Sequence, residues 1–169
     1  ALNAPAEVDV RVNLARVTRE QARTSLARDN IETEPTPLSP VGLRLKQRGN
    51  LDATKAFRQG LIEVQDEGSQ LIALLTGAKP GMTIVDSCAG AGGKTLALAD
   101  AMGLQGGSEA KGRLVACDIS AKRLARMDER IERAGAGAIE RHVLKETGDT
   151  LSIAADRVLV DAPCSGVGA

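Results

Sequence analysis

Aromatic residues are almost absent from this sequence: its 169 residues include one phenylalanine, Phe57, and no tryptophan or tyrosine. Hydrophobic residues nevertheless make up 43% of the chain, so a core can form and must be built from aliphatic side chains. No apolar run approaches the roughly 20 residues that a membrane-spanning helix needs, and the first residues carry no signal-peptide pattern. We therefore expect no membrane partner.

Cysteine and histidine are also scarce. The three cysteines, Cys88, Cys117 and Cys164, are odd in number and lack the short Cys/His spacings of a zinc site. Their pattern indicates reduced thiols, a cytoplasmic protein and no bound metal. His142, the lone histidine, lies in a strand pattern and is interpreted as structural.

Net charge is zero overall but uneven along the chain. Residues 1–60 carry ten Lys/Arg against seven Asp/Glu, and residues 61–169 carry twelve against fifteen. The basic lean of the first part is compatible with RNA binding. A difference of this size is equally common on solvated surfaces, so the charge alone assigns no partner.

Residues 83–95 organise the chain. A β-branched run ends in Asp86, and Gly90, Gly92 and Gly93 follow before a helix that we expect to open near Lys94. Strand, glycine-rich turn and helix in this order are typical of an α/β crossover. Glycines let a ligand approach the backbone, and a helix N-terminus offers unpaired N–H groups, so the turn is predicted to hold a nucleotide-like ligand.

Three ligands compete for this turn. A phosphate-binding P-loop has glycine where this chain has Cys88, and a dinucleotide fingerprint has glycine where this chain has Thr95. S-adenosylmethionine has no phosphates and needs an acid on the next strand for its ribose hydroxyls. Asp118 ends that strand, although such an acid suits NAD equally well.

The pattern of elements predicts two parts. Residues 1–60 read as a small α+β module, with a strand at 8–13, a capping box from Thr18 to Gln21 and a strand at 41–46. Residues 61–169 read as part of a parallel, doubly wound, Rossmann-like sheet, which the strand at 61–64 enters. Helices are predicted at 65–76, at 95–102 and as one long helix capped by Ser120 and ended by Gly135.

Four motifs together resemble the RNA cytosine C5-methyltransferases of the Sun (RsmB) type, the bacterial ribosomal RNA enzymes and their nucleolar relatives. The motifs are Val-Gln-Asp-Glu-Gly-Ser-Gln at residues 64–70, Asp-x-Cys-Ala-Gly-Ala-Gly-Gly-Lys-Thr at 86–95, Asp-Ile-x-x-x-Arg-Leu at 118–124 and Asp-Ala-Pro-Cys-Ser-Gly at 161–166. Many members have proline where this turn has Ala91. The resemblance implies an incomplete Rossmann-like S-adenosylmethionine-dependent methyltransferase fold that methylates ribosomal RNA, most naturally that of the small subunit.

The resemblance also implies the site residues. Asp161 would face cytosine N3 and also lie beside the cofactor, and Cys164 would assist product release. A further acid follows the third strand in the family, and Asp149 is the nearest candidate here. S-adenosylmethionine would be held by Cys88, Ala89, Gly90, Ala91, Gly92, Gly93, Lys94, Asp118, Arg123, Asp149 and Asp161.

The family's nucleophile is a second cysteine in a Thr-Cys-Ser motif on a later strand, and this chain contains no Thr-Cys. We therefore expect a fragment truncated at its C-terminus that does not methylate RNA by itself. Two alternatives remain: a P-loop-like phosphotransferase and a non-enzymatic RNA-binding module.

Each site residue also has a plainer explanation. Asp118 could cap a helix, Cys88 and Cys117 could be small buried residues, and Lys94 could pair with Asp161 instead of contacting a cofactor.

Overall fold

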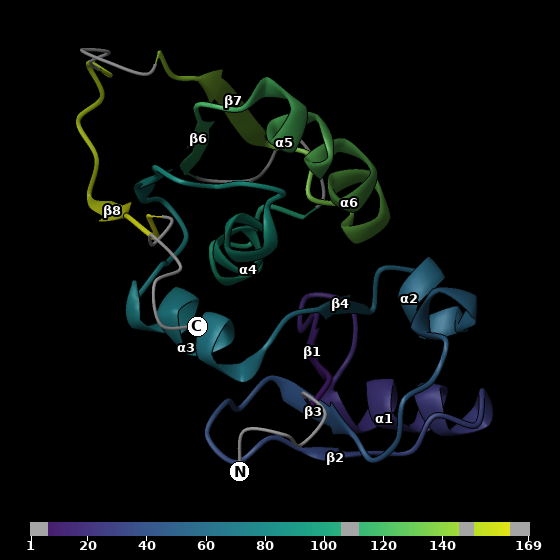
Figure 1. Cartoon of the computed structure of the whole chain (residues 1–169). Coiled ribbons are helices and arrows are strands. Elements are labelled where there is room, and N and C mark those ends of the chain that lie inside the picture. Colours follow the sequence, from purple (N-terminus) through teal and green to yellow (C-terminus); the bar gives the residue numbers. More distant parts are fainter. Residues whose placement is uncertain (1–6, 106–111, 146–150, 163–169) are drawn as a thin grey trace, which may run out of the picture. The chain divides into compact units, whose positions relative to one another are not determined.

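The computed structural model describes residues 7–105, 112–145 and 151–162. The chain forms two compact units, Ala1–Ile72 and Ala73–Ala169, and each unit has its own four-stranded sheet (Figure 1).

The first unit is an antiparallel sheet of order β2-β3-β1-β4 with helices. Its elements are β1 (Asp9–Val12), α1 (Arg19–Arg28), β2 (Thr33–Pro35), β3 (Gly42–Leu45), the 3-10 helix η1 (Leu51–Ala53), α2 (Lys55–Arg58) and β4 (Ile62–Val64). The predicted capping box begins α1: Gln21 N–H donates to Thr18 Oγ1 at 3.2 Å, and Thr18 N–H donates to Gln21 Oε1 at 2.8 Å. Aliphatic side chains such as Val10, Leu26 and Ile62 fill the core, as expected from the scarcity of aromatics.

The strand predicted at residues 61–64 lies in this first sheet, so its assignment to the second domain was wrong. β4 pairs antiparallel with β1, with Val10 opposite Val64 and Val12 opposite Ile62. Sequence pattern places a strand but does not name its partner, because the partner lies some 50 residues away along the chain. The two units divide between Ile72 and Ala73, within helix α3 (Glu67–Leu75), whereas the sequence placed the boundary near residue 60.

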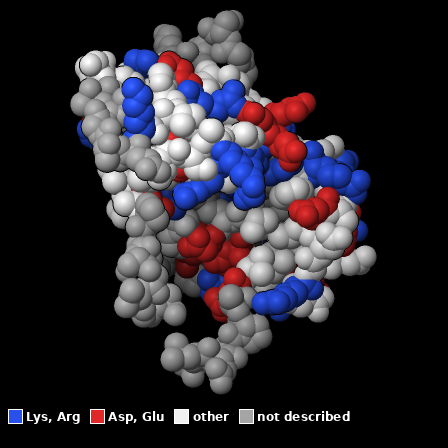
Figure 2. All heavy atoms as spheres, turned by 45° about the horizontal axis from the view of Figure 1, so that its top comes forward, with Lys and Arg blue, Asp and Glu red and all other residues white. Residues whose placement is uncertain are grey.

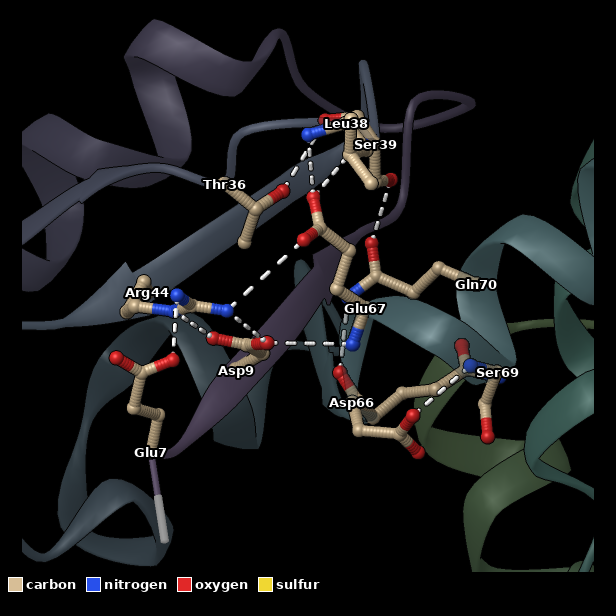
Figure 3. A network of polar contacts seen from close by, with 11 residues as sticks. Glu7, Asp9, Thr36, Leu38, Ser39, Arg44, Asp66, Glu67, Ser69 and Gln70 are labelled. Carbon is tan, nitrogen blue, oxygen red and sulfur yellow. Dashed lines mark hydrogen bonds and ion pairs between the residues drawn. The ribbon is translucent and has the colours of Figure 1, made fainter. Parts of the chain in front are cut away.

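A polar network anchors the start of α3 to the first unit (Figure 3). Arg44 donates to both carboxylate oxygens of Asp9, at 2.8 and 3.0 Å, and Asp9 in turn accepts the Glu67 N–H at 3.2 Å. The Glu67 carboxylate accepts the backbone N–H groups of Leu38 at 2.6 Å and Ser39 at 2.7 Å, and these bonds lower the pKa of Glu67. Residues of the 64–70 motif therefore have a structural role in the first unit.

The second unit is a parallel sheet of order β7-β6-β5-β8, as predicted. Its elements are β5 (Thr83–Asp86), α4 (Gly93–Ala101), β6 (Arg113–Asp118), α5 (Ala121–Ala125), α6 (Met127–Ala134), β7 (Ile139–Val143) and β8 (Arg157–Leu159). The chain runs from β5 outward to β7 and then returns to the other side of β5 at β8. The strand order therefore reverses between β5 and β8, which is where open α/β sheets bind ligands.

Successive side chains of a strand point to opposite faces of the sheet, and both faces of this sheet carry apolar residues. Ile84 and Leu114 pack with α4 and α6 residues in the larger cluster. On the other face, Val85, Val115 and Cys117 pack with Leu144, Leu151, Ile153 and Ala155. Because both faces are covered, the strands read as nearly continuous apolar runs.

The predicted helices differ from the observed ones in extent, and α3 (Glu67–Leu75) is shorter at both ends than the predicted 65–76. The helix predicted from Ser120 to Gly135 is interrupted at Arg126, whose N–H donates to Arg123 O in a tight i→i−3 bond, so α5 and α6 are separate. Helix α4 begins at Gly93, two residues before the predicted start, because Gly92 caps it in the left-handed conformation with φ of +86°.

Charged side chains of both signs are interspersed on the face of the protein shown in Figure 2. Two ion pairs in the second unit illustrate this mixture: Arg113 with Glu140, at 2.8 Å, and Arg141 with Asp128. On this face, charge alone therefore does not single out an RNA-binding surface.

Candidate cofactor site

The glycine-rich turn between β5 and α4 has a defined geometry. Gly92 N–H donates to Ala89 O at 2.9 Å, which closes a four-residue turn whose second residue, Gly90, has φ of +56°. Ala89 N–H donates to Cys117 O at 2.8 Å and so ties the turn to β6. Glycine is needed at both positive-φ positions because a side chain would be strained there.

Three carboxylates lie at neighbouring strand ends beside this turn. Asp86 is the last residue of β5, Asp118 is the last residue of β6, and Asp161 lies two residues beyond β8. Because β5 pairs with β6 on one side and with β8 on the other, the predicted juxtaposition of these acids is confirmed. Their roles toward a ligand remain a prediction.

Asp118 is buried and holds the turn in place through both of its carboxylate oxygens. One carboxylate oxygen, Oδ2, accepts the Gly90 N–H at 2.9 Å, and the other, Oδ1, accepts the Ser120 N–H at 2.8 Å. Arg123 lies on α5 with its Nη1 3.7 Å from Asp118 Oδ2. A carboxylate has about four lone-pair sites, so two further hydrogen bonds can still be accepted, as the two hydroxyls of a ribose require.

Asp86 is buried and structural in character. It is 1% exposed, and its Oδ2 accepts a hydrogen bond from Thr95 Oγ1 at 2.7 Å. Burial raises the pKa of Asp86, and the Thr95 hydroxyl and the charge of Lys94 partly oppose that rise. The Asp86–Thr95 bond joins the end of β5 to the first turn of α4 and so holds the glycine turn between them.

Lys94 and Asp161 form an ion pair at the position where the strand order reverses. Lys94 Nζ lies 2.5 Å from Asp161 Oδ2, and the two side chains are 17% and 44% exposed. Lys94 is in the first turn of α4, and Asp161 follows β8. Sequence analysis assigned Lys94 to the cofactor, and Asp161 to both the cofactor and the base. Their contact agrees with the alternative given there, that Lys94 pairs with Asp161.

The two described cysteines are poor nucleophiles. Burial, followed by the negative charges of Asp118, Asp86 and Asp161, raises the pKa of the half-buried Cys88. Burial also raises the pKa of the fully buried Cys117 to about 11. Both thiols stay protonated near neutral pH, and the thiolate is the reactive form.

Two predicted site residues, Cys164 and Asp149, lie outside the described residues. The remaining predicted cofactor residues belong to the turn, to the start of α4, to the end of β6 and the helix after it, or, for Asp161, to the segment after β8.

Sequence analysis missed a contact from helix α6. Arg130 Nη1 donates to Ala91 O at 2.9 Å, and a Cβ placed on Gly92 would lie 2.4 Å from Met127 Cγ. No sequence signal identifies Arg130, because a basic residue in a helix is normally interpreted as part of a solvated face. The contact of Met127 with the turn was not predicted either.

The site carries charges of both signs and can bind hydroxyl groups. Asp86, Asp118 and Asp161 gather here together with the cations Lys94, Arg123 and Arg130, and Asp118 keeps lone pairs that hydroxyl groups can use. In the described ranges, no set of three His, Cys, Asp or Glu side chains is arranged to hold a metal ion. A search of the same residues finds no helix long and apolar enough to cross a membrane.

Both units match models of known protein families. A family model described as 16S rRNA methyltransferase RsmB/F matches residues 73–169, and a second, described as the RsmF/B-like ferredoxin-like domain, matches residues 1–52. The probable ribosomal RNA small subunit methyltransferase B of Bacillus subtilis (strain 168) is 30% identical over 167 residues, which cover 97% of this chain and 36% of the relative. Ribosomal RNA small subunit methyltransferase B of Pasteurella multocida (strain Pm70) is 34% identical over 167 residues, or 94% of this chain and 35% of the relative.

A solved methyltransferase homolog protein from Pyrococcus horikoshii has the same fold, with a TM-score of 0.83 and 25% identity over 99% of this chain and 53% of that one. The chain spans about a third of the length of the curated relatives that it matches. The RsmB/F model alone covers more than half of the chain. The resemblance drawn from the sequence motifs is therefore confirmed: the chain belongs to the RsmB/F family of 16S ribosomal RNA methyltransferases.

Proposed function

We propose that the second unit binds S-adenosylmethionine and that the protein methylates cytosine C5 in small-subunit ribosomal RNA. The observation that carries the proposal is the meeting of Asp86, Asp118 and Asp161 around one glycine-rich turn, in a chain of the RsmB/F family. Such a substrate places the reaction in the cytoplasm.

The residues present fit the cofactor. A Cβ on Gly90 would meet no atom within 4 Å, so the space beside the turn is open for close approach of a ligand. The unused lone pairs of Asp118 suit ribose hydroxyls. S-adenosylmethionine supplies a methyl group on positively charged sulfur.

The turn is poorly suited to phosphates, which disfavours a P-loop phosphotransferase. A phosphate-binding loop aims free backbone N–H groups at the anion. Here the N–H of Ala89 donates to Cys117 O, that of Gly90 to Asp118, and that of Gly92 back to Ala89 O. Three of the donors that a phosphate would need are thus already used within the protein.

Asp161 is the residue proposed to face the base. Cytosine C5 is too electron-poor to attack a methyl sulfonium unaided, and addition of a thiolate at C6, which the family draws from its Thr-Cys-Ser cysteine, together with a proton at N3 makes C5 nucleophilic. After methyl transfer a base would remove the C5 proton, and elimination across C5–C6 would free the thiolate. Asp161 stands on the switch-point side of the sheet with a half-exposed carboxyl, able to hydrogen-bond N3 of a base taken out of its stack. Lys94 orients that carboxyl, and Cys164 keeps the role in product release that the resemblance implies.

The first unit is proposed to contribute to RNA binding. Residues 1–60 carry the basic side of the charge balance, which is compatible with RNA, and residues 1–52 match a domain that accompanies RsmF/B-like methyltransferases. Small-subunit ribosomal RNA is the partner, by analogy with the named relatives.

Titration calorimetry tests the cofactor. We expect heat with S-adenosylhomocysteine and none with ATP plus magnesium or with NADH. Heat with ATP plus magnesium, and with neither of the other two ligands, would support the phosphotransferase. No heat with any of the three ligands would leave a non-enzymatic RNA-binding module.

Nucleoside analysis tests the reaction. Small-subunit ribosomal RNA from cells whose gene for this protein carries Asp161→Asn should lose a 5-methylcytidine that wild-type cells contain. Unchanged 5-methylcytidine, or loss of a different methylated nucleoside, would overturn the choice of base.

A further inference from the structure

Helix α6 lies directly behind the glycine-rich turn. Two of its residues, Met127 and Arg130, are three positions apart and so share one face of the helix. The Met127 side chain fills the space where Gly92 would carry a Cβ, with Met127 Cγ 2.4 Å from that position. From the same face, Arg130 Nη1 donates to Ala91 O at 2.9 Å.

The turn is held at consecutive residues by different parts of the fold. Ala89 and Gly90 are bonded to β6 through Cys117 O and Asp118 Oδ2. Ala91 is bonded to α6 through Arg130. The carbonyl of Ala91 takes no part in the bond that closes the turn, which uses Ala89 O, so Arg130 restrains a peptide group that the turn itself leaves unrestrained.

The conformation at Ala91 explains why such a restraint matters. Gly90 has positive φ, whereas Ala91 is not among the described residues with positive φ, and this sequence of signs is that of a type II′ turn. Proline would fix the negative φ of the third turn residue without using its N–H. Alanine leaves that angle free, and the peptide after Ala91 turns about ψ of Ala91 and φ of Gly92, so contacts from outside the turn mainly oppose a flip of that peptide.

We propose that Arg130 is a positioning residue of the cofactor site. Its guanidinium holds the Ala91 carbonyl toward α6, which fixes the direction of the next peptide and of the N-terminus of α4, where Lys94 begins its reach to Asp161. A guanidinium-to-carbonyl bond is charge-assisted and stronger than a bond between neutral groups. This proposal rests on the proposed function for its ligand and extends it to a residue outside the matched motifs.

Removing the guanidinium tests the role. Arg130→Met keeps the length of the side chain and removes its donors, and we expect it to weaken S-adenosylhomocysteine binding about tenfold, which corresponds to about 1.4 kcal/mol. Arg126→Met removes an exposed arginine from the junction between α5 and α6 and is the matched control, expected to bind as wild type. Wild-type affinity in Arg130→Met would overturn the proposal.

A second substitution separates positioning from general damage to the fold. Adding Ala91→Pro to Arg130→Met should restore part of the lost affinity, because the ring fixes φ of residue 91 and so limits the conformations open to the turn. If Ala91→Pro restores nothing and the urea midpoint of Arg130→Met has fallen, the arginine is merely structural and the proposal is overturned.

Amide exchange in the ligand-free protein keeps the two proposals distinguishable. The Gly92 N–H, bonded to Ala89 O, should exchange faster in Arg130→Met than in wild type or Arg126→Met. If wild type gives no heat with S-adenosylhomocysteine, the proposed function fails, and the exchange rate of Gly92 still decides the role of Arg130. Equal exchange in all three proteins would overturn that role.

Discussion

Replacing each of three glycines by alanine should separate the structural and the ligand-binding functions of the turn. Gly90, Gly92 and Gly103 all have positive φ, of +56°, +86° and +68°. The three differ in what an added Cβ would meet. Gly92 would place it 2.4 Å from Met127 Cγ, whereas Gly90 and Gly103 would place it in open space.

The magnitudes follow from these differences. The left-handed backbone costs an alanine about 1–2 kcal/mol at each of the three positions. Only at Gly92 is there an added overpacking cost of about 1–3 kcal/mol, because Met127 is fully buried and cannot move into solvent. Gly92→Ala should therefore destabilise by about 2–5 kcal/mol, and Gly90→Ala and Gly103→Ala by about 1–2 kcal/mol each.

Ligand binding should separate Gly90→Ala from Gly103→Ala, although their stabilities are similar. The Cβ of Gly90→Ala would project into the space assigned to the cofactor beside Asp118, so we expect the affinity for S-adenosylhomocysteine to fall more than about tenfold. Gly103→Ala carries the same backbone strain at the far end of α4 and should bind as wild type. Urea unfolding and titration calorimetry on the same samples measure both quantities.

Two results would refute this reasoning. If Gly92→Ala is as stable as Gly103→Ala, Met127 does not pack against the turn as described. If Gly90→Ala binds as tightly as Gly103→Ala, the ligand does not approach the backbone at the turn.

Three further predictions concern the charged groups and thiols of the site. The pKa of Asp86 is raised in the folded state. Between the unfolded pKa, about 3.9, and the folded pKa, the folded state therefore binds more protons than the unfolded state. Ionising Asp86 costs stability as pH rises through that window. Asp86→Asn keeps an acceptor for Thr95 and lacks this cost, so its stability relative to wild type should increase from acidic to neutral pH in urea titrations; a constant difference would contradict the raised pKa. Lys94→Met should lower the unfolding free energy by less than about 1 kcal/mol because its partner Asp161 is half exposed, and added salt should reduce the difference; a larger, salt-independent loss would count against this account. Alkylation of Cys117 by iodoacetamide at pH 8, followed by mass spectrometry, should be on the order of 100-fold slower in the folded protein than in urea, since a pKa near 11 leaves little thiolate; equal rates would show that the thiol is neither buried nor shifted.

Much of the second unit is readable from local sequence. The β-branched run of β5, the glycines after it and the apolar spacing of the following segments predict strands, turns and helices because each depends on neighbours a few residues away. The strict alternation of strand and helix then predicts a parallel sheet, and a parallel sheet brings the carboxyl ends of its strands to one edge. For that reason Asp86, Asp118 and Asp161 could be placed together before any coordinates were known.

Other features depend on contacts between distant segments. β4 pairs with β1 although both patterns merely read as strands, and the acids and amides of the 64–70 motif bind the first unit through Asp9 and Ser39. The break in the helix at Arg126 depends on one tight backbone bond that no propensity predicts.

The sequence alone therefore determined the family, the type of each major element and the acids that share one sheet edge. Only the tertiary structure decided that Lys94 pairs with Asp161, that Asp118 holds the Gly90 amide, and that Arg130 reaches the Ala91 carbonyl from 39 residues away. The physical reason is range: backbone conformation follows from adjacent residues, whereas the partner of a buried polar group is set by packing across the whole unit.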